Sequence, residues 1–445
     1  MTSRDTIAAV ASPAGTGAVA LLRVSGPEAM AVAGKVWRGR GLEPRKATHG
    51  SIVDDSGQVL DSVVATFFKG PASFTGEDTV EICCHGGMLV TQRVLEVLLR
   101  AGARTAGPGE FTQRAYLNGK LDLTQAEAVM DVISAQTDAA LRAAQRQLDG
   151  VIGARVTSLR DELLDVLAHV EAYIDFPEED ISPDTGVILR GSINSVAAGI
   201  DRLLATADQG RILREGALAV LGGVPNAGTS SLLNRLLGCE RAIVSEIPGT
   251  TRDTIEEVIA LQGIPLRLVD TAGLREVEDA VEREGVTRTR RMVDRADLII
   301  EVVDASQPAV ERVSLSGDSG AKFLLVLNKA DLGIHDSWKD SGGVAVSSLT
   351  GQGVEDLTAG IVHALSAGGE GFTGMEAAVN ARHKACLERA AGALRAATAQ
   401  LDCAAAPEFV AVDLHDALIA LGEVAGKTDT EDLLGVIFSR FCIGK

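Results

Sequence analysis

The sequence predicts a multidomain fold of class α/β plus α. An α+β N-terminal domain is followed by a discontinuous helical domain into which an α/β domain is inserted. Residues 1–117 alternate short β-like runs with helical patterns. Residues 121–214 and 374–445 have the periodicity of helices, and the segment between them again alternates strands with helices. Because a complete α/β unit lies between two helical blocks, we expect the blocks to pack together as one domain.

Four segments are therefore expected. An α+β domain spans 1–118, a first helical part 119–213, an α/β domain with a mostly parallel sheet 214–370, and a second helical part 371–445. The glycine-rich stretch 368–374 is one expected hinge.

The elements follow from the periodicity of apolar residues. In the N-terminal domain we expect strands at 6–11, 19–24, 63–68 and 79–83 and helices at 28–36 and 88–101. The helical blocks predict helices over 121–133, 138–174, 377–401 and 415–424. Apolar strands of the inserted domain are expected at 218–222, 266–269, 298–303 and 323–327.

The composition excludes several classes of protein. A net charge of −19 argues against non-specific coating of nucleic acid, although basic clusters at 35–46 and 283–295 leave room for a local basic patch. No run approaches the roughly 18 apolar residues of a membrane span, and the first residues lack a signal-peptide pattern. The six cysteines lack metal-binding spacing and read as reduced thiols, so we expect a cytoplasmic protein.

A glycine-rich turn follows the apolar run at 217–221. Gly223, Gly228 and Ser230 fit the phosphate-binding pattern G-x-x-x-x-G-K-S/T, except that Thr229 replaces the lysine. Backbone N–H groups of such a turn bind phosphates, and the Ser230 hydroxyl is placed to bind Mg²⁺. Without its lysine, this pattern alone is weak support for a nucleotide site.

Four further motifs lie along the chain in the order expected of a GTPase. Two of these motifs lie at the ends of apolar strands. They are the D-x-x-G tetrad 270–273 and the N-K-x-D tetrad 328–331. Asp331 can accept both N–H donors of guanine, which adenine does not offer. Ser347 and Ser348 fit a loop that supports the base, and the segment 249–253 supplies a threonine for Mg²⁺. Together the motifs predict a guanine-nucleotide site.

The residue after D-x-x-G is Leu274, which cannot orient water as a glutamine would. Hydrolysis therefore needs another group. Glu282 and Glu284 are candidates, and the alternative is that both are solvent-facing acids.

Over essentially its whole length the chain resembles the MnmE (TrmE) family of tRNA-modification GTPases. The resemblance is carried by the segments 5–11, 22–26, 74–78, 85–87, 109–112, 118–123 and 441–445, together with the four motifs above. It implies a Ras-like G domain and an N-terminal domain similar to folate-binding one-carbon domains, which mediates homodimerisation. It also implies a heterotetramer with the FAD-dependent partner MnmG. The pair installs an aminomethyl or carboxymethylaminomethyl group on C5 of the wobble uridine, U34, of certain tRNAs.

The resemblance assigns roles to individual residues. Arg23, Glu81, Lys120 and Lys445 would bind a formyl- or methylene-tetrahydrofolate, with Cys442 nearby. Mg²⁺ would be bound by Ser230 and Thr251, and K⁺, which stimulates the family's GTPase activity, by Asn226, Ser245, Ile247 and Thr250. Glu282 would be the catalytic residue, acting through water. The GTP-binding residues would be Asn226, Ala227, Gly228, Thr229, Ser230, Ser231, Ser245, Thr250, Thr251, Asp270, Thr271, Ala272, Gly273, Asn328, Lys329, Asp331, Ser347 and Ser348.

Three positions depart from the family pattern: Thr16 replaces an arginine, Ser348 an alanine and Thr229 the lysine. The last loses one charge-assisted phosphate contact, about 1.5–3 kcal/mol, which is roughly 10- to 150-fold in affinity. An active but weakened GTPase is the leading hypothesis. The alternatives are a folate- and partner-binding scaffold whose G domain binds GTP weakly and does not cycle, and, less favoured, a ribosome-assembly GTPase.

Overall fold

A computed structural model describes residues 5–175, 187–239, 256–270, 292–309, 320–366, 378–403, 405–426, 431–439 and 441–445. The chain divides into two compact units. Unit 1 comprises Met1–Met130, Gly153–Pro183 and Ala396–Lys445, and unit 2 comprises Asp131–Ile152 and Asp184–Arg395. The expected hinge at 368–374 lies outside the described residues.

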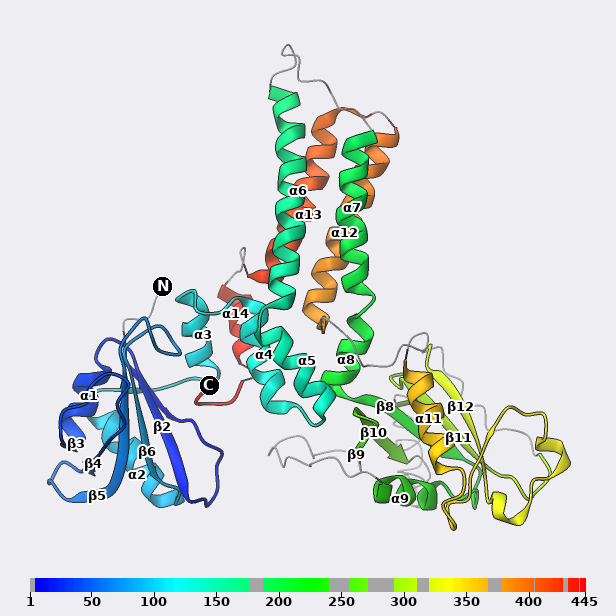
Figure 1. The fold of residues 1–445 in the computed structure, drawn as a ribbon, viewed down its shortest axis with the longest axis horizontal. Helices are drawn as coiled ribbons and strands as arrows, with labels where there is room; N and C mark the ends of the chain where they lie inside the picture. Colours follow the sequence, from blue (N-terminus) through cyan, green and yellow to red (C-terminus); the bar gives the residue numbers. More distant parts are fainter. Residues whose placement is uncertain are drawn as a thin grey trace, which may run out of the picture. The chain divides into compact units, whose positions relative to one another are not determined.

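Unit 1 contains a seven-stranded sheet in the order β3-β4-β5-β6-β2-β1-β7. Neighbouring strands are antiparallel, except that β1 and β7 are parallel. Helices α1 (Ala29–Val36) and α2 (Met88–Arg100) pack against this sheet (Figure 1). Their buried residues recur at helical spacing and join one apolar core with the strands. The strands are β1 (Ile7–Val10), β2 (Val19–Ser25), β3 (Trp37–Gly39), β4 (Thr48–Val53), β5 (Val59–Phe68), β6 (Thr79–His85) and β7 (Arg104–Thr105).

The four strands and two helices predicted for this domain are confirmed, whereas β3, β4, the short β7 and helix α3 (Glu110–Leu117) were not predicted. β4 contains His49, Gly50 and Ser51, which lack the alternating apolar pattern of a strand. The ring of Trp37 lies where Cβ atoms on Gly39 and Gly50 would be. Glycine at these positions therefore makes room for the ring, and weakens the sequence signal at the same time.

The helices of unit 1 bring distant parts of the chain together. Leu123 and Ala126 of α4 (Leu123–Ser134) share a core with residues of α14 (Glu431–Phe438) and with Phe441. Pro108 bridges to Ile443, next to α3 (Glu110–Leu117). The last residues of the chain thus pack against helices α3 and α4. The long helix α6 (Val151–Asp175) and α13 (Pro407–Ala425) complete the unit.

The helical stretch predicted over 138–174 forms two helices. α5 (Asp138–Leu148) ends before Gly150, whose φ of 86° is left-handed, and α6 starts at Val151. The helix predicted at 415–424 begins earlier, because Pro407 occupies a first-turn position where its missing N–H costs nothing.

Unit 2 contains a six-stranded sheet in the order β13-β12-β11-β8-β10-β9. It is parallel apart from the edge strand β9, which is antiparallel to β10, so the predicted mostly parallel sheet is confirmed. Helices α9 (Thr229–Cys239) and α11 (Val354–Leu365) share one apolar core with it (Figure 1). The strands are β8 (Ala217–Gly223), β9 (Glu256–Leu261), β10 (Ile264–Asp270), β11 (Leu298–Asp304), β12 (Lys322–Asn328) and β13 (Val344–Ala345). The other α-helices described in this unit are α5, α7 (Val187–Leu204), α8 (Ala207–Glu215) and most of α12 (Ala381–Asp402).

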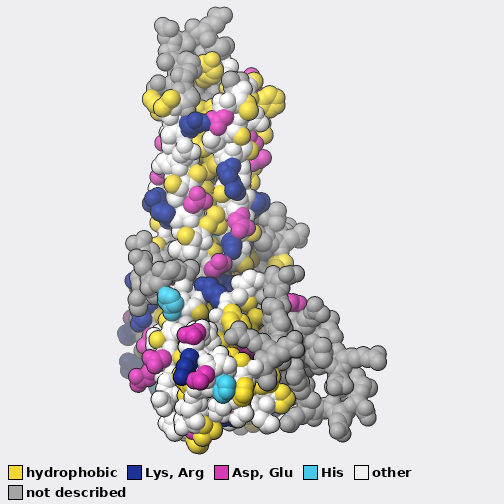
Figure 2. Space-filling model, turned by 90° about the vertical axis from the view of Figure 1, so that its right-hand side faces the viewer, with side chains coloured by type: hydrophobic (Ala, Val, Ile, Leu, Met, Phe, Trp, Pro, Cys, Tyr) yellow, Lys and Arg dark blue, Asp and Glu magenta, His cyan; other side chains and the backbone are white. Residues whose placement is uncertain are grey.

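The surface is mixed in charge. On the face in Figure 2, basic and acidic side chains are interspersed along the helices. Among the residues that the structure describes, no helix has both the length and the apolar character needed to cross a bilayer.

Candidate functional site

The predicted phosphate-binding turn lies at the carboxyl end of β8. Gly223 ends this strand, and a Cβ atom there would collide with the carbonyl oxygen of Val302 on β11. Asn226 and Gly228 have left-handed backbones, with φ of 68° and 91°, which asparagine and glycine adopt most readily. Helix α9 begins directly after the turn at Thr229. Its free N–H groups and positive dipole end therefore lie where phosphates would bind.

Two oxygen ligands converge beside the turn. The Ser230 hydroxyl donates a hydrogen bond to Oδ2 of Asp270, at 2.8 Å. Strands β8 and β10 are parallel neighbours, with Asp270 beside Leu221, which explains why residues 40 positions apart meet. The hydroxyl is a hard oxygen donor of the kind that Mg²⁺ prefers alongside phosphate oxygens, and the carboxylate beside it can hold the metal through a water molecule. The pair therefore fits a magnesium site.

Asn328 joins the phosphate-binding turn to the base loop, which we define as residues 347–352. Its side chain is buried, and Nδ2 donates to the carbonyl oxygen of Ala227 at 2.8 Å. Its Oδ1 accepts hydrogen bonds from the backbone N–H and the hydroxyl of Ser348, at 3.1 and 2.9 Å. The serine that replaces the family's alanine thus adds a bond that alanine cannot make.

The rest of the N-K-x-D motif lies beside this link. Lys329 forms an ion pair with Asp304 at the end of β11, with Nζ 2.7 Å from Oδ2. Burial alone would raise the pKa of Asp304, but hydrogen bonds from Lys329 and Ser306 outweigh burial and hold the pKa below its usual value. Asp331 lies exposed on a short 3₁₀ helix, Ala330–Leu332. Its carboxylate is therefore accessible to the N–H donors of a base.

Thr229 supplies no charge to the site. Its side chain is 6% exposed, and its methyl group lies 3.4 Å from the place where a Cβ of Gly223 would be. The side chain therefore packs against the end of β8. Any positive charge at the β- and γ-phosphates must come from elsewhere.

The structure brings the predicted residues 226–231, 270, 328–331 and 347–348 to the carboxyl edge of one sheet. The remaining predicted residues, Ser245, Ile247, Thr250, Thr251, Thr271, Ala272, Gly273 and Glu282, lie outside the described residues.

A second cluster of predicted residues lies in unit 1. Arg23 and Glu81 are register partners on β2 and β6, and Nη2 lies 2.8 Å from Oε1. The guanidinium is 5.0 Å from the ring centroid of Phe74 and 5.5 Å from that of Phe111. Its Nη1 is buried without a partner among the described residues. A buried, unsatisfied charged donor between two rings fits a planar ligand that carries an acceptor.

The other two residues of this set lie close to it. The ammonium of Lys120 donates to the carbonyl of Pro71, at the start of the loop that carries Phe74. The carbonyl of Lys445 accepts a hydrogen bond from the N–H of Phe111 at 3.2 Å. Cys442 is an exposed free thiol. Phe74 and Phe111 belong to the segments that carry the family resemblance, but their contact with Arg23 was not predicted.

The sequence also gave no indication of a buried charge cluster around Arg114 of α3. Its Nη2 lies 2.7 Å from Asp5 and 2.9 Å from Glu110, and its Nη1 lies 3.2 Å from Glu77. Glu110 is also paired with Arg104. Burial alone would raise the pKa of Glu110, but the hydrogen bonds from Arg104, the Gly107 amide and Arg114 hold it below its usual value. The cluster fixes α3 against the loop that contains Glu77 and Phe74.

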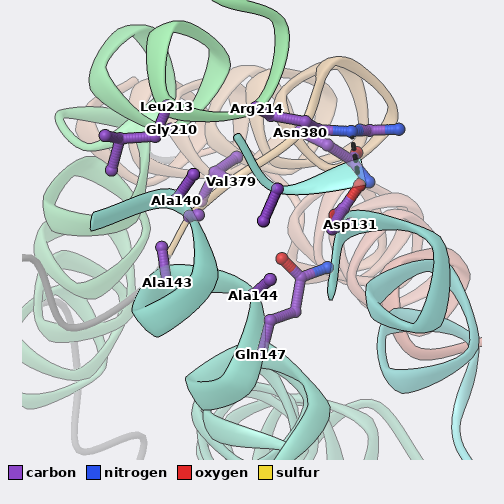
Figure 3. Close-up of a pocket in the computed structure, with 12 residues that line it drawn as sticks. Asp131, Ala140, Ala143, Ala144, Gln147, Gly210, Leu213, Arg214, Val379 and Asn380 are labelled. Carbon is purple, nitrogen blue, oxygen red and sulfur yellow. Dashed lines mark ion pairs between the residues drawn. The ribbon is translucent and has the colours of Figure 1, made fainter. Parts of the chain in front are cut away.

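A pocket elsewhere in unit 2 does not qualify as a ligand site. It lies between α5, α8 and the start of α12, beside the ion pair of Asp131 with Arg214 (Figure 3). Alanines line much of it, and its volume of about 20 Å³ holds about one water molecule.

A mostly parallel sheet whose strand ends carry a phosphate-binding turn, a serine–aspartate oxygen pair and an N-K-x-D base site defines a P-loop protein of the guanine-nucleotide-binding class. Comparison with known proteins is consistent with this class. The family described as MnmE helical domain matches residues 123–442, and the one described as GTP-binding protein TrmE N-terminus matches residues 6–120. The chain belongs to the MnmE family of tRNA modification GTPases.

Full-length relatives support the assignment. The tRNA modification GTPase MnmE of Akkermansia muciniphila is 52% identical over 444 residues, with 99% of each chain covered. The relative from Geobacter sulfurreducens is 47% identical, again over 99% of each chain. The relative from Geobacillus thermodenitrificans is 44% identical over 100% of each chain.

Proposed function

We propose that the chain binds GTP with Mg²⁺ and hydrolyses it as part of the modification of the tRNA wobble uridine. The observation that carries the proposal is the joint placement of Ser230, Asp270, Asn328 and Asp331 at one edge of the unit 2 sheet. Each has the chemistry that a guanine nucleotide requires at that place.

Each group of residues in the proposed site has its own role. N–H groups of the turn at 226–231 would hold the phosphates, Ser230 and Thr251 would bind Mg²⁺, and Asp270 would hold the metal through water. Asp331 accepts the two guanine N–H donors, and the loop with Ser347 and Ser348 supports the base. Glu282 is the group that positions the attacking water, because Leu274 cannot. When bound, Mg²⁺ and a K⁺ ion at Asn226, Ser245, Ile247 and Thr250 supply positive charge against the phosphates.

The cluster in unit 1 supports binding of a tetrahydrofolate derivative by Arg23, Glu81, Lys120 and Lys445. The unpartnered Nη1 of Arg23 and the rings of Phe74 and Phe111 suit a flat, polar heterocycle. The role of the bound folate is to supply the one-carbon group.

We expect a cytoplasmic homodimer that acts with an MnmG-type flavoprotein on tRNA. An exposed apolar cluster supports a protein contact on unit 1: Val19, Met88 and Leu89 are 63%, 70% and 70% exposed. Val19 is paired with His85, three residues before Met88, which places Val19 near the start of α2.

Thr229 favours a second candidate, a folate- and partner-binding scaffold that does not cycle through GTP. The two candidate functions differ in whether the protein hydrolyses GTP. GTP hydrolysis should be measured with K⁺ and with Na⁺, and wobble uridines should be analysed by mass spectrometry in a deletion strain that expresses the chain. K⁺-dependent turnover together with restored modification supports the proposal. Restored modification without GTP turnover supports the scaffold and overturns the proposal, and ribosome co-sedimentation with unchanged wobble uridines contradicts both.

A further inference from the structure

Arg235 connects the helix of the phosphate-binding turn to the base loop. It lies on α9, on the same helix face as Ser231 one turn earlier, and is half-buried. Its Nε donates to the carbonyl of Ser348 at 3.1 Å, and its Nη2 donates to the carbonyl of Leu349 at 2.5 Å. The planar guanidinium thus holds two successive carbonyls at once with two nitrogens in a fixed fork, whereas a lysine ammonium has a single nitrogen on a flexible stem.

These bonds close a ring that includes both ends of the proposed nucleotide site. From the turn, Ala227 is bonded to Asn328, and Asn328 to Ser348. From Ser348, Arg235 leads back to α9, which begins at the turn. The distance between the phosphate end and the base end is therefore set by two independent connections.

The base loop itself is compact. The N–H of Ser347 donates to the carbonyl of Gln352, and the N–H of Gly351 donates back to the carbonyl of Ser347, both at 2.9 Å. The hydroxyl of Ser347 accepts from the N–H of Thr350 at 3.1 Å. Since the loop is closed by its own hydrogen bonds, its placement depends on what holds it from outside, and Asn328 and Arg235 do so at neighbouring residues.

We propose that Arg235 is a positioning residue that holds the base loop ready for guanine before the nucleotide arrives. The inference rests on the proposed function, because it assumes that the site binds guanine nucleotides. Arg235 touches neither the phosphates nor the chemistry at the γ-phosphate. With Thr229 supplying no charge to the phosphate end, a preformed base end carries more of the affinity.

The proposal has a kinetic consequence. Without Arg235 the base loop must be ordered by the nucleotide, and the cost is the same in the ground state and in the transition state for hydrolysis. Such a loss of uniform binding raises KM and leaves kcat unchanged. A residue that only stabilised the fold would lower the amount of folded enzyme without changing KM.

The test compares Arg235→Met, which keeps an unbranched apolar stem, with Arg235→Lys and with the control Arg295→Met, an exposed arginine of the same unit. Measurements are Kd for GDP, KM and kcat for GTP, the midpoint of thermal unfolding, and hydrogen exchange of the 347–352 amides without nucleotide. We expect Arg235→Met to raise Kd and KM about tenfold, or about 1.4 kcal/mol, with kcat within about twofold and faster exchange in the loop. Arg235→Lys should fall between it and the wild type, and Arg295→Met should match the wild type.

The outcomes separate this inference from the proposed function. Unchanged Kd and loop exchange in Arg235→Met, or a fall in kcat at unchanged KM, overturns the inference while the wild type still binds GDP. A wild-type protein that binds neither GDP nor GTP overturns the proposed function itself, and the inference with it.

Discussion

At the scale of single residues, Thr229 determines how well the phosphate end of the proposed site can work. Its side chain is buried against Gly223 and carries no charge. We expect Thr229→Lys to tighten GTP binding roughly 10- to 150-fold, because a charge-assisted phosphate contact contributes about 1.5–3 kcal/mol. Turnover should rise as well, to the extent that the contact strengthens in the transition state.

The measurement is a titration with a fluorescent GTP analogue, together with single-turnover hydrolysis. Thr358→Lys is the matched control, because it adds the same charge on α11 away from the turn. Equal affinity of Thr229→Lys and the wild type would show that another group already supplies the missing charge.

The positions of single residues could be predicted where a motif fixes both the residue type and its place in the fold. The positions of Asp270 and Asn328 at strand ends, and of Ser230 at the start of α9, follow from apolar runs and spacing. The contact of Arg235 with Ser348 does not, because the two residues are 113 positions apart and neither belongs to a pattern that involves the other. Such contacts depend on how α9 and the base loop pack, which the local sequence does not encode.

At the scale of elements, α3 is anchored by charge as well as by apolar packing. The carboxylate of Glu110 has a pKa below its usual value in the folded protein, because Arg104, the Gly107 amide and Arg114 outweigh the effect of burial. A group with a lowered folded pKa stabilises the fold at pH values above its unfolded pKa of about 4.3. That stabilisation is lost as the pH falls from about 4.3 through the lower folded value.

We therefore expect unit 1 to lose stability below about pH 4.3. Glu110→Gln should lower the free energy of unfolding of unit 1 by about 1–3 kcal/mol at pH 7. In this variant the free energy of unfolding should also fall less as the pH is lowered. Urea unfolding followed by Trp37 emission in a Trp338→Phe background measures this in unit 1. Glu96→Gln is the control, since its pair with Arg93 is on the surface and is worth about 0–1 kcal/mol. If both glutamine variants behave alike, the Arg114 cluster does not anchor α3.

Elements were predictable where apolar periodicity was strong, as in β8, β11 and α2. The break between α5 and α6 was missed although Asp149 and Gly150 form a recognisable stop, because alanine-rich sequence continues the helical pattern on both sides. Strands β3 and β4 were not predicted because their sequence signal is too weak. Their glycines are required by the ring of Trp37, a contact that only the folded sheet creates.

At the scale of the whole molecule, the prediction of a helical domain interrupted by an α/β insertion did not reveal which distant segments would meet. Phe441 and Phe438 pack with Leu123, and the carbonyl of Lys445 bonds to Phe111. These contacts bring the end of the chain to the cluster around Arg23. The proposed nucleotide site and the proposed folate site lie in different compact units, each with its own core.

This separation predicts ligand-specific stabilisation. The two tryptophans are Trp37 in unit 1 and Trp338 in unit 2, so Trp338→Phe and Trp37→Phe give matched single-tryptophan reporters. GDP with Mg²⁺ at about 100 times Kd should stabilise unit 2 by about 2.7 kcal/mol, which raises the urea midpoint of the Trp338 signal by about 1–2 M. The Trp37 transition should stay in place. A tetrahydrofolate derivative should do the reverse, because its proposed site lies beside Arg23. If either ligand moves both transitions equally, the units unfold as one cooperative body and the two sites are thermodynamically linked.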